Sequence, residues 1–184
     1  MGNREKLLDG ALTCLLQKGY ARTTARDIAT TAGVSLAAIG YHFGTTEALL
    51  SAALFQAMGR WAEQLEQALV DDGDKGLPPV ERRAAVWRRV IDSVRADPAL
   101  WAVQFELVTE IQRRPELREQ LAGAQVAARE GLAELFEGID PAAEPDRAHR
   151  VGALYQALLT GVVAQHLVDP THAPGAAELA RGLP

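Results

Sequence analysis

The stretch from Asp27 to Phe43, DIATTAGVSLAAIGYHF, contains two short apolar-patterned runs that are separated by a single glycine, Gly33. Each run is only about two turns long, and an isolated helix of that length is not stable in water. The two helices must therefore pack on each other and on a neighbour. We expect Gly33 to adopt the left-handed conformation that ends the first helix. This constraint predicts a compact group of short helices near the start of the chain.

Signals at the ends of both runs support this pair of helices. Thr24 and Asp27 have the spacing of a capping box, and Ser35 is expected to cap the second helix, which runs to His42. Ala29 is small where the two helices must cross. The residues expected to fill the space between the helices are Ile28, Ala32, Val34 and Ile39. This pattern is typical of a helix-turn-helix, whose second helix enters the DNA major groove, although an ordinary helical hairpin has the same pattern.

The remainder of the chain predicts helices, because apolar residues recur at helical spacing and strict alternation is absent. The expected long helices cover residues 47–70, 99–113, 115–137 and 146–168, the last of them ending the helical part of the chain. A further helix follows the loop at 71–79 and ends before Pro98. The predicted fold class is all-α, with a three-helix helix-turn-helix head at residues 1–46 and a larger helical body for ligand binding and dimerisation at residues 47–184.

Composition narrows the class of protein. With 184 residues, of which 48% are hydrophobic and 23% charged, the chain fits a soluble protein with a real core. The net charge of −5 is uneven: the first 50 residues contain five Lys and Arg against four Asp and Glu, and the rest carries −6. We expect no membrane-spanning run and no signal peptide, so the predicted location is cytoplasmic.

Neither catalysis nor a cofactor is expected. The single cysteine, Cys14, excludes an internal disulfide and a multi-cysteine metal site, and the histidines lack the spacing of metal ligands. No nucleophile and base are paired, and no glycine-rich loop is placed to hold phosphate. The sequence therefore predicts a protein that is not an enzyme and has no metal and no cofactor.

The segment TTARDIATTAGVSLAAIGYHFGTTEALL resembles the DNA-binding domain of the TetR family of transcriptional regulators. The matching features are Lys18-Gly19-Tyr20, Thr23-Thr24, Ile28-Ala29, Ala32-Gly33-Val34-Ser35, Tyr41-His42-Phe43 and Glu47-Ala48-Leu49-Leu50. The likeness covers residues 4–50, whereas the body is similar only in the number and order of its helices. The resemblance implies a recognition helix from Ser35 to His42 and an intersubunit four-helix bundle in the body.

We expect DNA contacts from both cationic and uncharged side chains. The predicted DNA-binding residues are Arg4, Arg22, Thr24, Arg26, Ser35, Leu36, Ala37, Gly40, Tyr41, His42, Thr45 and Thr46. The resemblance assigns phosphate contacts to Tyr41 and His42, and Leu36 can contact only an apolar group such as a thymine methyl. The family often has a polar or basic residue in place of Leu36 and a lysine in place of Thr46. These departures predict a shallow salt dependence for each subunit.

Stripes of small residues in the last two long helices predict a homodimer. The predicted interface consists of Gly123, Ala127, Gly131, Ala153, Ala157, Leu158, Gly161 and Ala164. The helix at 146–168 is apolar on two sides, and such a helix is buried on two sides. One side can face the body and the other a second copy of the chain. A fully internal helix pair is the alternative.

Gln104 predicts a small-molecule site, because its amide falls in the middle of the apolar face of the helix at 99–113. A buried amide needs a partner, and aromatic walls around a polar group are typical of a ligand pocket. The other expected wall residues are Met58, Trp61, Leu65, Trp87, Ile91, Trp101, Phe105 and Val108. Alternatively, Gln104 bonds a neighbouring carbonyl and the tryptophans are core. Glu106 and Glu110 are expected to be solvated.

These features lead to one main hypothesis and two alternatives. The main hypothesis is a ligand-responsive transcriptional regulator, a repressor that is released from double-stranded operator DNA by a small, largely apolar molecule. The first alternative is a DNA-binding regulator without a small-molecule ligand, whose body only dimerises. The second is a helical metabolite-binding protein or enzyme with no sequence-specific affinity for DNA.

Overall fold

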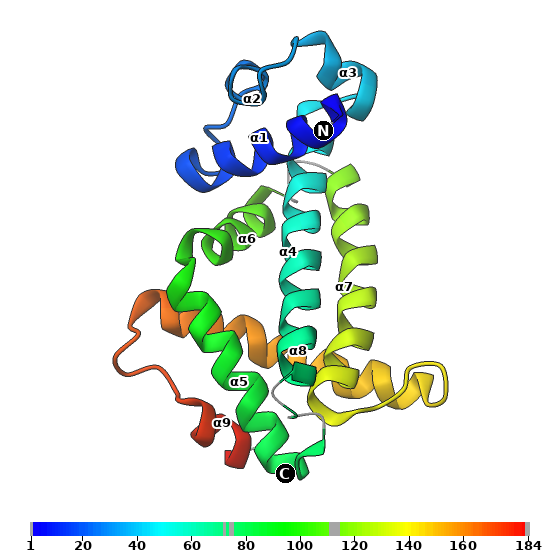
Figure 1. Ribbon diagram of the computed structural model, residues 1–184, viewed down its shortest axis with the longest axis vertical. Helices are drawn as coiled ribbons and strands as arrows, with labels where there is room; N and C mark the ends of the chain where they lie inside the picture. The colour runs from blue at the N-terminus through cyan, green and yellow to red at the C-terminus, as the bar shows by residue number, and fades with distance from the viewer. Residues whose placement is uncertain (1, 72, 74–75, 111–114, 183–184) are drawn as a thin grey trace. The chain divides into compact units, whose positions relative to one another are not determined.

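The computed structural model describes residues 2–71, 73, 76–110 and 115–182, and Figure 1 shows its ribbon. The regular elements of these residues are all helices: α1 (Asn3–Lys18), α2 (Ala25–Ala32), α3 (Ala37–Phe43), α4 (Thr46–Asp71), α5 (Pro79–Ala96), α6 (Pro98–Glu110), α7 (Pro115–Glu137), α8 (Pro145–Val168) and α9 (Ala176–Gly182). The all-α prediction is confirmed. Helix α9 was not expected, and the predicted end of α6 at residue 113 lies outside the described residues.

The chain divides into two compact units, which we describe separately. Unit 1 comprises Met1–Trp61 and Ala99–Glu119, and unit 2 comprises Ala62–Pro98 and Gln120–Pro184. Helices α4 and α7 each contribute residues to both units. This division by compactness differs from the division by function that was predicted at residue 46, and the functional division remains a proposal.

In unit 1, α2 and α3 pack against α1 (Figure 1). Leu7 of α1 and Ile28 of α2 are fully buried, and Ile39 of α3 is 4% exposed. Helices α1 and α2 approach closely at Gly10, where a Cβ would lie 2.9 Å from the Cβ of Ala32. The prediction placed the small residue Ala29 at the crossing of α2 and α3, and Ala29 is 7% exposed.

The start of α2 has the predicted capping box. The Thr24 hydroxyl accepts the Asp27 N–H at 3.2 Å, and Asp27 Oδ2 accepts the Thr24 N–H at 3.0 Å. Gly33 ends the helix in the left-handed conformation, with φ 64° and ψ 36°. The prediction that Ser35 caps the next helix was wrong. The N-cap position is occupied by Leu36, which is in the right-handed helical conformation and has no polar side-chain atom to form a cap. The Ser35 carbonyl accepts the Ala38 N–H at 3.0 Å.

The core of unit 2 is a row of aromatic rings from three helices. Trp87 of α5 packs against Phe136 of α7 with ring centroids 4.8 Å apart, and Phe136 stacks on Tyr155 of α8 at 4.1 Å. The Tyr155 hydroxyl donates to Glu137, which also pairs with Arg83 at 3.1 Å. Burial and the hydrogen bond to this carboxylate raise the pKa of Tyr155. A buried arginine and a buried phenol therefore share one carboxylate at the edge of the aromatic row.

Helices α7 and α8 touch at the level of the backbone within unit 2. A Cβ placed on Gly152 would lie 1.9 Å from the carbonyl oxygen of Arg129, so only glycine fits at this position. The Arg129 side chain turns toward α8 and donates to Gln156 Oε1 at 2.9 Å. This close approach within the protomer involves Gly152, a residue that was not among those predicted for the dimer interface.

Helix α8 is long and apolar enough to cross a membrane by length and composition, contrary to our expectation that no such run exists. Core helices of soluble proteins can have the same length and apolar composition. Only 28% of its most apolar stretch is buried. The buried part includes Gly152, Tyr155 and Val162, which face the rest of unit 2. Much of the apolar surface of α8 is therefore uncovered in a single protomer.

The ion pair at the start of α2 gives a testable pH dependence. Lys18 Nζ lies 2.6 Å from Asp27 Oδ1. Hydrogen bonds from Lys18 and from Thr24 lower the pKa of Asp27 to about 2. An unfolded aspartate has a pKa of about 3.9, so the unfolded chain binds the proton first as the pH falls. The contribution of Asp27 to stability should be complete above pH 4 and should be lost between about pH 4 and pH 2.

We expect an NMR titration of the Asp27 carboxyl to show a midpoint near 2 in the wild type. Lys18→Met should raise this midpoint, because it removes the largest cause of the shift. An unperturbed midpoint in the wild type would show that the Lys18–Asp27 pair does not form in solution.

Candidate nucleic-acid interface

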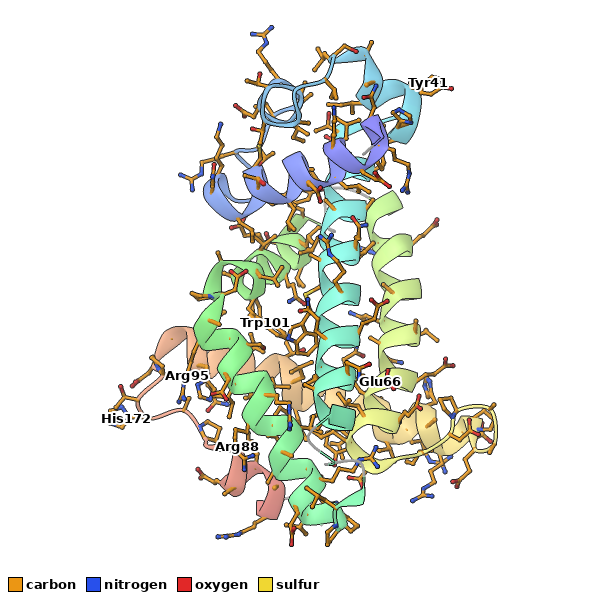
Figure 2. All side chains as sticks on the ribbon, in the orientation of Figure 1. Tyr41, Glu66, Arg88, Arg95, Trp101 and His172 are labelled. Carbon is orange, nitrogen blue, oxygen red and sulfur yellow. The ribbon has the colours of Figure 1, made fainter. Side chains whose placement is uncertain are left out.

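The residues predicted to contact DNA all belong to unit 1 and lie on its surface. Ten of the twelve are exposed, and His42 and Thr46 are half-buried. Tyr41 is 86% exposed and points away from the head (Figure 2), and Leu36 is 52% exposed. Tyr41 on α3 and Leu36 just before α3 are not stabilised by this exposure in a free protomer. Their outward position fits a surface that is covered by a partner.

Contacts within the head orient part of this surface. The Arg4 guanidinium carbon lies 5.4 Å from the centroid of the Phe43 ring, within the range of a cation–π contact. This contact holds the positive charge of Arg4 beside the end of α3. The rings of Tyr41 and His42 meet edge to face at 4.8 Å. The cation and the two polar aromatic side chains are therefore grouped at the same end of α3.

Two of the predicted threonines already serve as helix caps. The Thr24 hydroxyl donates to Asp27 Oδ2 at 2.7 Å, so the negative carboxylate occupies the α2 N-terminus that was expected to attract phosphate. Thr45 Oγ1 accepts the Ala48 N–H at 3.0 Å and caps α4. Arg22 also has an internal bond, from its Nε to the Lys18 carbonyl at 2.8 Å. Among these groups, Thr24 is the least suited to bind a phosphate, since Asp27 repels it.

The expected ligand-binding residues are divided between the two units. Unit 1 contains Met58, Trp61, Trp101, Gln104, Phe105 and Val108, and unit 2 contains Leu65, Trp87 and Ile91. Val108 was expected to face inward but is 57% exposed, because the buried side of α6 is centred on Val103 and Leu107. The ligand-binding role of the nine residues stays a prediction.

In unit 1, Gln104 lies on the same helix as Trp101 and contacts Met58 of α4. Trp61 of α4 and Trp101 of α6 meet edge to face with ring centroids 4.8 Å apart. Trp101 lies on the side of α6 that faces α4 (Figure 2). Gln104 is half-buried, and its amide nitrogen donates to the sulfur of Met58 at 3.3 Å. Trp101 is 2% exposed, and its indole N–H has no partner among the described residues. The Gln104 amide thus has only a weak acceptor, and the Trp101 indole N–H has none among the described residues.

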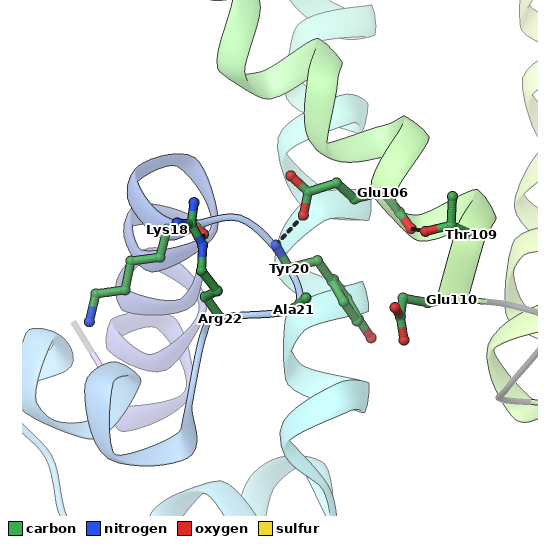
Figure 3. Close-up of a pocket in the computed structure, with 7 residues that line it drawn as sticks. All are labelled: Lys18, Tyr20, Ala21, Arg22, Glu106, Thr109 and Glu110. Carbon is green, nitrogen blue, oxygen red and sulfur yellow. Dashed lines mark hydrogen bonds between the residues drawn. The ribbon is translucent and has the colours of Figure 1, made fainter.

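Two clefts lie elsewhere. A cleft of about 340 Å³ in unit 1 is lined by Lys18, Tyr20, Ala21, Arg22, Glu106, Thr109 and Glu110 (Figure 3). A cleft of about 240 Å³ in unit 2 is lined by Trp87, Leu158, Pro174, Glu178, Leu179 and Gly182. The first contains none of the nine expected ligand residues. The second contains Trp87 from that set and Leu158 from the expected dimer interface.

Glu106 is a residue whose role the sequence analysis missed. It was expected to be solvated, and this was wrong. The side chain is half-buried, and Oε2 accepts the backbone N–H of Tyr20 at 2.6 Å (Figure 3). The two residues are 86 positions apart, so no local signal could have revealed the contact.

The expected dimer residues are open on one protomer. Gly123, Ala127, Gly131, Ala157 and Gly161 are exposed, and Ala153, Leu158 and Ala164 are half-buried. A Cβ at any of the three glycines would meet nothing within 4 Å, so no contact within the protomer requires them to be small. Two large apolar residues that were not predicted accompany them: Val126 is 49% exposed and Leu154 is 51% exposed.

Family models match both parts of the chain. The model of bacterial regulatory proteins of the tetR family matches residues 7–53, which include α2 and α3. The model of the tetracyclin repressor-like C-terminal domain matches residues 78–183, more than half of the chain. The first match covers most of the residues predicted to contact DNA, and the second covers most of the predicted body.

Curated relatives carry the same description. The chain is 28% identical over 159 residues to the HTH-type transcriptional regulator BetI of Rhizobium meliloti, a match that covers 86% of this chain and 75% of BetI. It is 35% identical over 119 residues to the HTH-type transcriptional repressor AcnR of Corynebacterium efficiens, which covers 61% of this chain and 63% of AcnR. These relatives are regulators of transcription, which agrees with the prediction that the chain is not an enzyme.

Solved structures extend the similarity to the whole fold. The multidrug binding protein EbrR, complexed with imidazole, matches with a TM-score of 0.70 at 25% identity, over 100% of this chain and 93% of EbrR. The TetR-family member SCO1917 of Streptomyces coelicolor A3 matches with a TM-score of 0.69 at 26% identity, over 100% of this chain and 96% of that protein. With both of its parts matched by family models, the chain belongs to the TetR family of DNA-binding transcriptional regulators.

Proposed function

We propose that the protein is a homodimeric repressor that is released from operator DNA by a small, largely apolar molecule. The observation that carries the ligand part is the pair of poorly satisfied donors on α6. Leaving a buried N–H without a partner costs about 1–3 kcal/mol. The Trp101 indole N–H has no partner among the described residues, and the Gln104 amide reaches only a thioether, a weak acceptor. A ligand with an acceptor atom and a flat aromatic body would satisfy both donors and pack on the tryptophans.

The similarity to EbrR supports the same ligand class. EbrR is described as a multidrug binding protein and has been solved with imidazole and with proflavin. Both molecules are aromatic rings with nitrogen atoms, so they combine a flat surface with few polar groups. We infer that the effector of this chain has the same general chemistry and that it binds in the body, which we assign to residues 47–184. The protein would act on DNA in the cytoplasm.

The head, at residues 1–46, would contact DNA with few charged side chains. Leu36, Ala37 and Gly40 present apolar or small surface at the start and middle of α3, which suits close contact with the edges of bases and with thymine methyl groups. Tyr41 would hold a phosphate through its hydroxyl, and Arg4 would add a cation beside it. Because such contacts release few counterions, operator affinity should depend only weakly on salt.

The first prediction concerns the recognition helix. The dimer should select a near-palindromic site whose half-sites lie about 34–36 Å apart, or a multiple of that distance. Tyr41→Ala should weaken binding on all sequences by about 1 kcal/mol, or roughly fivefold, since a phosphate contact carries no sequence information. Tyr41→Phe is the matched control that removes the hydroxyl and keeps the ring.

Leu36→Ala should instead change the preferred base at one position of the site. Selection of bound sequences from random DNA, followed by anisotropy titrations, measures both effects. Equal sequence preferences for Leu36→Ala and the wild type would mean that Leu36 does not read a base.

The second prediction concerns the dimer. The open small residues of α7 and α8, together with Val126 and Leu154, would form the intersubunit bundle. Gly161→Arg should place a bulky charge in this surface and dissociate the dimer in analytical ultracentrifugation. Ala177→Arg adds the same side chain at an exposed position of α9 and should leave the dimer intact. A Gly161→Arg protein that sediments as a dimer would place the interface elsewhere.

The third prediction concerns the effector. Imidazole and proflavin are suitable first probes, and their binding to the DNA-free protein can be followed by tryptophan fluorescence. A bound effector should lower operator affinity about 5- to 150-fold, the usual range of allosteric coupling. Gln104→Leu should fold, should keep operator affinity without effector and should respond less.

The matched control is Gln56→Leu, which removes the same amide from an exposed position of α4. A Gln104→Leu protein that responds like the wild type would show that Gln104 is a core amide. If no bound compound changes operator affinity, the protein is a DNA-binding regulator without a small-molecule ligand.

A further inference from the structure

The turn between α1 and α2 is closed by a carboxylate that comes from α6. Glu106 Oε2 accepts the Tyr20 N–H at 2.6 Å, and Tyr20 is only 4% exposed (Figure 3). Both residues belong to unit 1. Hydrogen bonds that involve an ionised group are about twice as strong as neutral ones. This bond, which we call the Glu106–Tyr20 link, joins the DNA-binding head to α6 through the backbone of the head.

The turn is shaped to admit this carboxylate. Gly19, next to Tyr20, has φ 79° and ψ 169°, a conformation that is essentially restricted to glycine. A Cβ on Gly19 would also lie 2.9 Å from both carboxylate oxygens of Glu106. Two further bonds of the turn are local: Thr23 Oγ1 donates to the Gly19 carbonyl at 2.7 Å, and Arg22 Nε donates to the Lys18 carbonyl at 2.8 Å. The Glu106–Tyr20 link ties this turn to α6.

The same helix carries the proposed ligand contacts. Gln104 precedes Glu106 by two residues, and Trp101 precedes it by five, on a helix that is continuous from Pro98 to Glu110. A displacement of α6 at Gln104 must therefore move the Glu106 carboxylate as well. On the head side, the turn leads within five residues from Tyr20 to the start of α2 at Ala25. The link thus connects the proposed effector site to the helix-turn-helix without passing along α4.

We propose that Glu106 is the positioning residue that couples α6 to the DNA-binding head through the Tyr20 backbone N–H. This inference rests on the proposed function, because it assigns a route for the effector signal. Glu106 touches neither DNA nor effector in this scheme. Its carboxylate sets the position of the α1–α2 turn relative to α6, so that a change in either one biases the other.

The first test measures the link directly in the full-length protein. Hydrogen exchange of the Tyr20 amide, read by NMR, should become at least about tenfold faster in Glu106→Ala, as expected for the loss of a charge-assisted bond. Glu106→Gln retains an uncharged acceptor and should give an intermediate rate. Glu119→Ala removes a carboxylate from an exposed position of α7 in the same unit and should leave the rate unchanged. An unchanged Tyr20 rate in Glu106→Ala would overturn the proposal.

The second test measures coupling and needs no effector. Because coupling is reciprocal, saturating operator DNA should change the exchange rates of the α6 amides in the wild type. In Glu106→Ala this remote change should be lost. Glu106→Gln should restore part of the change. If α6 does not respond to operator in the wild type, or responds equally in Glu106→Ala, the signal does not pass through Glu106.

The two proposals fail in different ways. Absence of any bound sequence from a random DNA pool would refute operator recognition, and absence of any compound that alters operator affinity would refute the effector. Neither result changes the exchange rate of the Tyr20 amide, which decides by itself whether the Glu106–Tyr20 link exists. A normal effector response in a Glu106→Ala protein would refute the coupling role and leave the proposed function standing.

Discussion

The packing of α2 on α1 is the interaction on which the DNA-binding head depends. Helix α2 has eight residues and α3 has seven, and neither length is stable alone in water. Burial of Ile28 and Leu7 and the close approach at Gly10 supply the tertiary contact that replaces intrinsic helix stability. Because this contact uses the inner face of α2, and Ile39 anchors α3, the outer face of α3 is left open. Tyr41 and Leu36 can therefore be exposed without destabilising the head.

Charged side chains are paired in different surroundings in the two units. In the head, Asp27 is paired with Lys18 near the surface and also caps α2, so a carboxylate that would repel DNA is partly neutralised. In unit 2, Glu137 forms an ion pair with Arg83 and accepts a hydrogen bond from the Tyr155 hydroxyl at the edge of the aromatic row. Removal of one partner from such a buried group leaves an uncompensated charge. The contacts of Glu137 therefore hold α5, α7 and α8 in fixed positions along one another.

Two glycines in α8 show how one helix can have an inner and an outer face. Gly152 is required within the protomer, because the Arg129 carbonyl occupies the space where a Cβ would be. A Cβ on Gly161 would meet no atom within 4 Å, and Leu154 on the same helix is 51% exposed. The inner face holds α7 against α8, and the outer face is available for a second copy of the chain. Both faces are apolar, which is why the composition of α8 by itself also satisfies the criteria for a membrane span.

The sequence by itself determined the features that depend on local chemistry. The capping box at Thr24, the left-handed Gly33 and the helical periodicity are properties of neighbouring residues, and the structure contains them. Its motifs also sufficed for the family, because a helix-turn-helix depends on spacing within one short segment. Local signals failed at the ends of α3 and α8, where the Ser35 side chain makes no cap and α9 follows Pro174 and Gly175.

Only the tertiary structure decided which residues meet across the chain. Glu106 and Val108 lie on one helix, and periodicity cannot tell that the first reaches Tyr20 whereas the second is exposed. Likewise, several glycines in α7 and α8 look equivalent in sequence, but among the described residues only Gly152 faces a backbone carbonyl. The physical reason is the same in each case. A helix pattern defines which residues share a face, whereas the partner of that face is set by packing between segments that are distant in sequence.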